Sequence, residues 1–292
     1  MEILANRIKL FLELVKFEHT IFALPFAYLG GVLAYQGIFH LHYWVWITLT
    51  MAGARTAGMA LNRLIDREID AKNPRTANRA LPKGLISIWQ VNLLVFASLF
   101  LLFFSAYKLN SLCLILSPVV VILLVSYSYL KRFTCLTHLG IGLVLACAPI
   151  GGWIAIKGSI TVLPIVLWAG VCFWTAGFDI IYATQDLGFD QKEGIHSIPA
   201  SFGLKNALVI SRPFHLITII SFILTGILGK MGLFYWVGIL AIIPLLIYEH
   251  SLISENDLSK VNTAFFSVNS LVSLILFISN VVDYFCNRSG GG

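Results

Sequence analysis

Long apolar segments separated by short polar ones run through almost the whole chain, and this pattern predicts a bundle of membrane-spanning helices. Most of these segments are long enough to cross a hydrocarbon core of about 30 Å at about 1.5 Å per residue. Nine spans are expected, at about 20–35, 43–65, 86–107, 111–130, 139–156, 161–183, 207–228, 233–248 and 263–282. Residues 2–17 instead set apolar positions against charged ones, which predicts an amphipathic helix lying at the membrane surface.

Composition agrees with this prediction and excludes a soluble protein. The 292 residues are 58% hydrophobic and only 12% charged, which is too apolar for a soluble domain. We therefore expect an all-α polytopic membrane protein, with about nine transmembrane helices around a central cavity and the lipid bilayer as its surroundings. The net charge of +6 reflects topology, so it implies no nucleic acid. No protein partner is implied either.

The positions of the basic residues predict the orientation in the membrane. With nine spans, fourteen of the twenty Lys and Arg residues fall on the side of the N-terminus and four on the other side. Since basic residues concentrate in cytoplasmic loops, the N-terminus is expected in the cytoplasm. The N-terminal segment contains Glu2, Glu13 and Glu18 and no cleavage pattern. These features favour a multi-pass protein of a bacterial or archaeal cell (inner) membrane.

A dense group of polar residues, from Asn62 to Gly84, interrupts this apolar pattern after the second span. Asn62, Asp66 and Asp70 lie four residues apart, so a helix would place them on one face. Arg75 and Arg79 follow. Carboxylates can hold Mg²⁺, and arginines can neutralise the phosphate groups that Mg²⁺ binds. Taken alone, this stretch is equally compatible with a charged cytoplasmic loop.

A second polar group, after the sixth span, decides between these two interpretations. Tyr182, Asp186 and Asp190 again lie four residues apart, and Asp179 precedes them. Both acidic pairs share one spacing, and both follow a long apolar segment on the side expected to be cytoplasmic. Two such pairs at matching membrane boundaries indicate a functional site that binds Mg²⁺ and phosphate groups.

Two basic residues outside these groups are further candidates. Arg55 is the one arginine well inside a predicted span, where a charge costs about 2.5–3.5 kcal/mol on insertion scales. It therefore either pairs with a buried group or faces a polar cavity and binds an anionic or phenolic substrate. Lys131, at the end of the fourth span, could contact a phosphate group or anchor the helix at the membrane surface.

The two groups together resemble the motifs of the UbiA superfamily of intramembrane prenyltransferases. The family pattern is NxxxDxxxD, followed by an RT…R segment and by DxxxD with a preceding tyrosine. The resemblance extends over the whole chain. It implies a single transmembrane prenyltransferase domain over residues 1–288, with two halves of about 1–135 and 136–288, and a flexible tail at 289–292. In this sequence the matching residues are Asn62, Asp66, Asp70, Arg75, Thr76, Arg79, Tyr182, Asp186 and Asp190.

This resemblance implies a reaction and a role for each candidate residue. Mg²⁺ is the expected cofactor, and the substrates are a polyprenyl diphosphate and a small aromatic acceptor of the 4-hydroxybenzoate type, as in ubiquinone and menaquinone biosynthesis. The catalytic, metal-binding residues would be Asp66, Asp70, Asp186 and Asp190. The diphosphate would be bound by Asn62, Arg75, Arg79, Lys131 and Tyr182. Arg55 is expected to bind the carboxylate of the acceptor.

The acceptor stays open because two positions depart from the 4-hydroxybenzoate enzymes. Ala80 stands where proline is common and His196 where lysine is common. Both features resemble archaeal members and the enzymes that prenylate 1,4-dihydroxy-6-naphthoate in the futalosine route to menaquinone. A haem or lipid-ether prenyltransferase would share the same donor site. A cation-coupled membrane transporter is the alternative from a different class, because intramembrane acids also carry ions.

Overall fold

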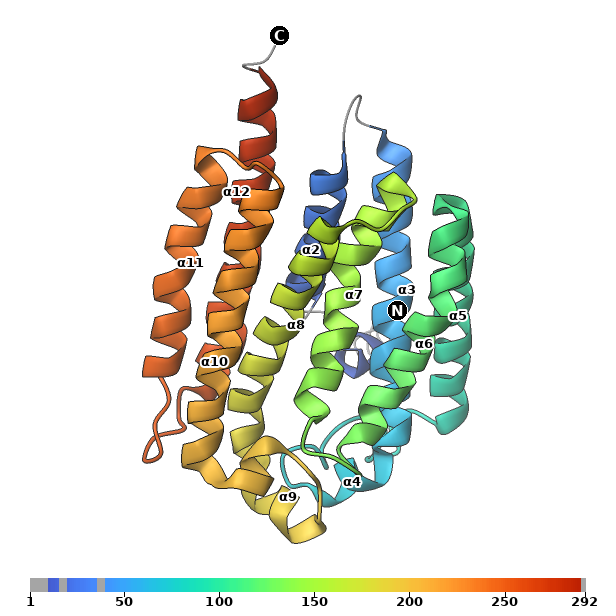
Figure 1. Ribbon diagram of the computed structural model, residues 1–292. Coiled ribbons are helices and arrows are strands. Elements are labelled where there is room, and N and C mark those ends of the chain that lie inside the picture. The colour runs from blue at the N-terminus through green and yellow to red at the C-terminus, as the bar shows by residue number, and fades with distance from the viewer. Residues whose placement is uncertain (1–9, 16–19, 36–39, 290–292) are drawn as a thin grey trace. The chain divides into compact units, whose positions relative to one another are not determined.

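The computed structural model describes residues 10–15, 20–35 and 40–289, and every described element is a helix apart from one isolated β-bridge in a loop (Figure 1). The chain divides into two compact units. Unit 1 comprises residues 1–20 and 41–129, and unit 2 comprises residues 21–40 and 130–292. The boundary near residue 129 lies close to the expected division between the two halves. The first long helix, however, belongs to unit 2, although the chain on both sides of it belongs to unit 1.

Unit 1 contains three long helices. Two of them pack along each other, and the third is followed by unit 2 in the sequence. Helix α3 packs against α5 through Gly53, where an added Cβ would overlap the backbone of α5. Ser87 begins α5 with a capping box, in which Ser87 and Gln90 satisfy each other's backbone N–H groups. The helices of this unit are α3 (Leu41–Ile65), α4 (Arg67–Lys72), α5 (Ile88–Leu109) and α6 (Ser111–Leu130).

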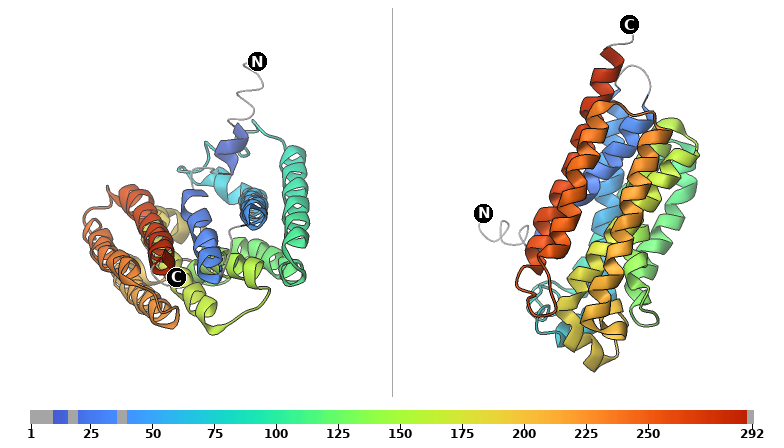
Figure 2. Two further views of the ribbon diagram at one scale, coloured as in Figure 1. Left: turned by 90° about the horizontal axis from the view of Figure 1, so that it is seen from above. Right: turned by 60° about the vertical axis from the view of Figure 1, so that its left-hand side comes forward.

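Unit 2 contains six long helices. Helix α8 packs against both α7 and α10, and α11 runs beside α12 in every view (Figures 1 and 2). The elements are α2 (Thr20–Ala34), α7 (Thr137–Lys157), α8 (Val162–Ala183), the 3₁₀ turn η2 (Thr184–Asp186), α9 (Leu187–Glu193), α10 (Ile198–Leu228), α11 (Leu233–Ser251), the π-helical segment η3 (Thr263–Val268) and α12 (Asn269–Ser289).

Three glycines explain how the helices of unit 2 pack and bend. Helices α2 and α7 touch backbone to backbone, because an added Cβ at Gly30 or Gly152 would overlap a carbonyl oxygen of the other helix. Small residues allow such close approach between membrane helices. Gly203 has a φ of 79° and divides α10 into a short first turn and a long span, which is a conformation that favours glycine.

These helices confirm the all-α membrane fold, but they do not confirm a count of nine spans. Among the described residues, seven helical segments are long and apolar enough to cross a membrane. Helix α2 is apolar but has only 15 residues, and α3 has 25 residues with a lower mean hydropathy. Of the amphipathic helix expected at 2–17, only residues 10–15 lie within the described part, and residues 10–14 are helical. Residues 290–292 of the expected tail lie outside it, and Ser289 ends α12.

Candidate active site

The first acidic motif lies where α3 ends, and the helix is interrupted at Asp66. This residue has φ −94° and ψ 4°, between the last residue of α3 and the first residue of α4. Such values lie in the sparsely populated bridge region, where many active-site residues are found. The expectation of one continuous helical face through Asp70 is therefore wrong in detail. The hydrogen bonds from Asp66 N to Asn62 O and from Asp70 N to Asp66 O still keep the three side chains one turn apart.

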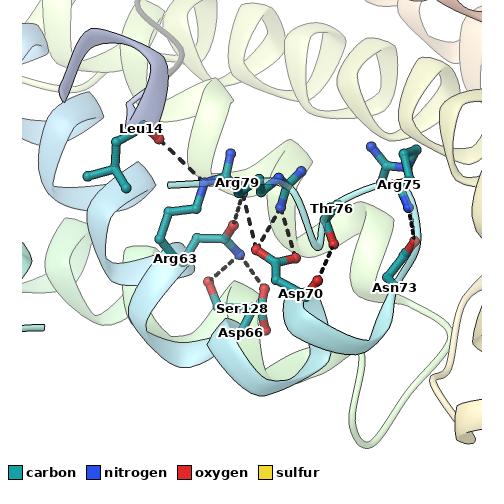
Figure 3. Close-up of polar contacts among 10 residues, drawn as sticks. Leu14, Arg63, Asp66, Asp70, Asn73, Arg75, Thr76, Arg79 and Ser128 are labelled. Carbon is teal, nitrogen blue, oxygen red and sulfur yellow. Dashed lines mark hydrogen bonds and ion pairs between the residues drawn. The ribbon is translucent and has the colours of Figure 1, made fainter. Parts of the chain in front are cut away.

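Asp70 is the centre of an ion-pair network in unit 1 (Figure 3). Its side chain is buried, with 6% of the residue exposed. Arg79 Nη1 lies 2.8 and 2.7 Å from its two carboxylate oxygens, and Arg63 Nη1 lies 3.7 Å from one of them. A buried carboxylate needs such partners because it has lost its hydration. This carboxylate is therefore held in place by positive charge.

The loop after α4 is folded so that Arg79 reaches Asp70. The Thr76 hydroxyl donates a hydrogen bond to the carbonyl of Asp70 at 2.9 Å, and the backbone N–H of Arg75 donates to the side chain of Asn73 at 2.9 Å. Thr76 and Asn73 are both buried. Arg75 is exposed, and its guanidinium lies apart from the Arg79–Asp70 pair (Figure 3). The two predicted diphosphate ligands of this loop thus stand in different environments.

Asn62 and Arg63 connect the first motif to the rest of unit 1. The amide of Asn62 donates hydrogen bonds to Asp66 Oδ2 at 2.6 Å and to the hydroxyl of Ser128 in α6 at 3.2 Å. Arg63 Nε lies 3.4 Å from the carbonyl oxygen of Leu14, to which it donates. Asp66 itself is buried. Because Ser128 and Leu14 belong to two other segments, the motif is positioned by tertiary contacts as well as by α3.

The second acidic motif repeats the same local geometry in unit 2. Helix α8 passes into η2, Asp186 has φ −99° and ψ 3°, and α9 then carries Asp190. Asp190 is buried, with 8% of the residue exposed, and its Oδ2 accepts a hydrogen bond of 2.9 Å from the hydroxyl of Ser197. In both motifs the first aspartate interrupts a long helix and the second is buried one turn later.

A histidine positions the segment that holds Asp190. Ser197 caps α10 by accepting a hydrogen bond from the N–H of Ala200, and the N–H of Ile198 donates to His138 Nε2 at 3.2 Å. Since Nε2 is the acceptor, the ring is neutral and carries its proton on Nδ1. That proton is donated to Asp179 Oδ2, 2.7 Å away. The hydrogen bonds that connect Asp179, His138 and Ile198 therefore fix the backbone next to Ser197.

The remaining predicted site residues lie at three places in the two units. Tyr182 is half-buried in α8 and stacks on Phe265 of η3, with ring centroids 4.0 Å apart. The carbonyl of Lys131, which follows α6, accepts a hydrogen bond of 2.7 Å from the N–H of His196, and both residues belong to unit 2. Arg55 is half-buried in α3, about 16 Å along the helix from Asp66.

The chain is similar to known proteins. The family described as the UbiA prenyltransferase family matches residues 23–280. The chain belongs to this family. Its motifs, its helical membrane fold and its relatives identify it as a prenyltransferase, and this excludes the interpretation as a cation-coupled transporter.

Curated relatives of this UbiA-family enzyme have one name in common. The 4-hydroxybenzoate octaprenyltransferase of Shewanella halifaxensis is 32% identical over 231 residues, which are 79% of each chain. The 4-hydroxybenzoate octaprenyltransferase of Shewanella pealeana is 28% identical over 284 residues, covering 96% of this chain and 98% of the relative. The similarity therefore extends over nearly the full length of both proteins.

Solved structures agree with the fold of this UbiA-family enzyme. The apo structure of a UbiA homologue from Aeropyrum pernix K1 is 35% identical, has a TM-score of 0.83, and is matched over 91% of this chain and 98% of that one. A UbiA homologue from Archaeoglobus fulgidus bound to GPP and Mg²⁺ has a TM-score of 0.75 at 23% identity, with coverages of 94% and 99%. The second likeness shows the fold alone.

The side chains present in this UbiA-family enzyme fit a hard divalent cation. Each motif supplies two carboxylates one helical turn apart, and carboxylate oxygens are the ligands that Mg²⁺ prefers. The guanidinium on both oxygens of Asp70 shows that this carboxylate already accepts a cation. In the part of the chain that the structure describes, no three His, Cys, Asp or Glu side chains form a ready-made metal site.

Several residues that position the motifs were not predicted from the sequence. His138 had no informative spacing, because its partners Asp179 and Ile198 are distant in the sequence. Ser128 and Leu14 are also distant from Asn62 and Arg63, so no local pattern reveals them. Ser197 could have been found, because a serine followed by Ile-Pro at the start of an apolar segment is typical of a helix N-cap.

Proposed function

We propose that this enzyme transfers a polyprenyl group from a polyprenyl diphosphate to an aromatic acid of the 4-hydroxybenzoate type, with Mg²⁺ as cofactor. The observation that carries the proposal is the repeated geometry of the two motifs, each with one buried aspartate one turn after a helix interruption. The names of the curated relatives support the acceptor, and the GPP and Mg²⁺ bound to a structural neighbour support the donor and the metal.

In this proposal both acidic motifs take part in binding the diphosphate. Asp66, Asp70, Asp186 and Asp190 would hold the metal ions. When bound, Mg²⁺ neutralises charge on the diphosphate and so makes it a better leaving group. Asn62 and Tyr182, each four residues before the first aspartate of its motif, complete the donor site with Arg75, Arg79 and Lys131, whose charges balance the remaining charge of the diphosphate.

The protein also protects the allylic carbon from water once the carbon–oxygen bond of the donor weakens. The allylic carbon that develops positive charge must meet the aromatic ring before it meets water. The spanning helices are almost entirely apolar, so they accommodate the isoprenoid tail and exclude water. The ring carbon attacks, the diphosphate leaves, and the ring loses a proton to restore its aromaticity. Arg55, deeper along α3 than the motif, binds the acceptor's carboxylate in this proposal.

The proposed location is the cell membrane, with the N-terminus and both motifs on the cytoplasmic side. The excess of basic residues in the loops on that side supports this orientation.

A direct assay tests the proposal. Purified enzyme in detergent is given geranyl diphosphate and Mg²⁺ together with 4-hydroxybenzoate or 1,4-dihydroxy-6-naphthoate, and products are identified by mass spectrometry. The expected result is a carbon-prenylated hydroxybenzoate that is absent with EDTA and restored by Mg²⁺. Prenylation of the naphthoate alone would refute the proposed acceptor, and full activity in EDTA would refute the metal.

A further inference from the structure

A cavity lies at the end of unit 2 that is remote from the second acidic motif. Its volume is about 340 Å³, and helices α2, α7, α8, α10 and α12 contribute its walls. The cavity is lined by Leu163, at the start of α8, whereas Asp186 follows the end of that helix. The 22 residues of α8 span about 33 Å. The cavity is therefore separate from the site of prenyl transfer.

Two buried side chains in the wall of this cavity have polar atoms that the protein does not satisfy. Asn280 is 0% exposed and Trp153 is 7% exposed. Neither the amide nitrogen and oxygen of Asn280 nor the indole nitrogen of Trp153 has a hydrogen-bond partner among the described residues. A buried polar group without a partner is costly, so it indicates a ligand or water. Both residues line one cavity, and this points to one bound molecule.

The charges around the cavity define the chemistry of that molecule. Lys230 lies in the lining and is exposed, at a backbone φ of 49° that non-glycine residues rarely adopt. Asp283 also lines the cavity, but its carboxylate accepts hydrogen bonds from the N–H groups of Gly232, Phe234 and Tyr235 and so caps α11. The indole N–H, the amide N–H and the ammonium are therefore three donors, suited to an anionic oxygen group.

We propose that this cavity binds the phosphate-bearing headgroup of an anionic membrane phospholipid, with phosphatidylglycerol as the best match. The three donors bind the phosphodiester, and the Asn280 carbonyl accepts from a hydroxyl of the headgroup. Trp153 lies one turn before the end of α7, and tryptophan and tyrosine are enriched at the headgroup level of membranes. Tyr35 and Tyr284, which also line the cavity, belong to the same aromatic layer. The acyl chains remain in the bilayer.

The experiment compares three substitutions with three controls in delipidated, detergent-purified enzyme. Trp153→Phe, Asn280→Leu and Lys230→Met each remove one donor, and Trp89→Phe, Asn206→Leu and Lys108→Met make the same changes at exposed positions elsewhere. The probes are phosphatidylglycerol, phosphatidylcholine and inorganic phosphate. The readouts are the midpoint of thermal unfolding and the number of lipids retained in native mass spectrometry.

The expected result is that phosphatidylglycerol raises the unfolding midpoint of the wild type and of the controls by several degrees, since a ligand that binds only the folded state stabilises it. The cavity variants lose at least half of this shift and retain one lipid fewer. Trp153→Phe is the most conservative change and keeps the test decisive if another variant fails to fold. Equal shifts in variants and controls, or an Asn280→Leu protein that is more stable and still retains the lipid, would overturn the proposal. A shift with inorganic phosphate alone would show a free anion as the ligand and would also overturn it.

Discussion

The two acidic motifs have the same backbone and different electrostatics. In both, the first aspartate has φ near −95° and ψ near 4° (−94° and 4° at Asp66, −99° and 3° at Asp186), and the second is buried one turn later. Asp70 is held by the guanidinium of Arg79, whereas Asp190 accepts a hydrogen bond from the neutral hydroxyl of Ser197. A repeated fold therefore does not imply repeated chemistry. The charge beside each buried aspartate depends on its side-chain partners, which are Arg79 and Arg63 at Asp70 and Ser197 at Asp190.

The two motifs also differ in the helices that precede them, α3 and α8. Counting back from the first aspartate, Asn62 corresponds to Tyr182, and Arg55 corresponds to Thr175. Thr175 is fully buried, whereas Arg55 is half-buried. Of these two helices, α3 thus carries a cation at this position and α8 does not, and the aromatic acceptor is expected to depend on α3 more than on α8.

The largest effect is expected from removing the charge of each buried aspartate. Asp70→Asn and Asp190→Asn should each lower prenyl transfer by at least about 10²–10³-fold, the range seen when one group that stabilises developing charge is lost. Their stabilities should differ, because Asp70→Asn removes the carboxylate paired with the buried Arg63. We expect it to cost up to a few kcal/mol, below the about 3–5 kcal/mol of a fully buried pair, since Arg79 is part exposed.

Prenyl transfer and thermal unfolding of the two variants, measured side by side, check this prediction. Equal loss of activity with unequal loss of stability would support the difference between the motifs. Activity of either variant within a few-fold of the wild type would contradict its assignment as a metal ligand.

The next effect concerns the cation of the first motif. Arg79→Met should raise the KM of the prenyl diphosphate by about 10–100-fold, because a charge-assisted hydrogen bond contributes about 1.5–3 kcal/mol. Arg79→Lys should recover part of it, since lysine offers a charge without the planar fork. Arg67→Met is the matched control, because Arg67 pairs with Glu68 at the surface. A normal donor KM in Arg79→Met would show that Arg79 serves only to hold Asp70.

A substitution of Arg55 tests the difference between α3 and α8. Arg55→Ala should raise the KM of the aromatic acid by at least about tenfold and leave that of the donor nearly unchanged, because an arginine–carboxylate pair away from water is strong and specific. Thr175→Val, at the corresponding position of α8, should change neither constant. If the donor KM rises instead, Arg55 belongs to the diphosphate site, and if only thermal stability falls, its role is structural.

The smallest effect is expected at the neutral partner of Asp190. Ser197→Ala removes a helix cap and one hydrogen bond to the carboxylate, which should lower stability by about 0.5–2 kcal/mol and activity by a few-fold. Ser87→Ala removes a comparable cap from α5, remote in sequence from both motifs. It should lower stability to a similar extent and leave activity unchanged. Loss of activity in both variants would mean that Ser197 acts through folding alone.

Much of this description follows from local sequence patterns, and the rest depends on contacts that are distant in the sequence. Most ends of the spans were predictable within a few residues because apolar length determines membrane helices. The exceptions are the start of α10, at Ile198 where about 207 was expected, and the end of α12, at Ser289 where about 282 was expected. The spacing of the aspartates predicted both motifs. The interruption at Asp66 and Asp186 was not predictable, because four-residue spacing also fits an unbroken helix. The partnership of His138 with Asp179 and the Asn62–Ser128 hydrogen bond join residues 41 and 66 positions apart.

Helix α2 also has a consequence for how the protein is made. It packs on α7 through Gly30 and Gly152, so its partner emerges from the ribosome more than a hundred residues later. At about 5–20 residues per second, α2 waits roughly 6–24 s. During this time a 15-residue apolar helix with an internal proline is shorter than the about 20 residues that span a bilayer unaided. The assembly of the nascent chain therefore depends on holding α2 in the membrane until the second half of the protein has been synthesised.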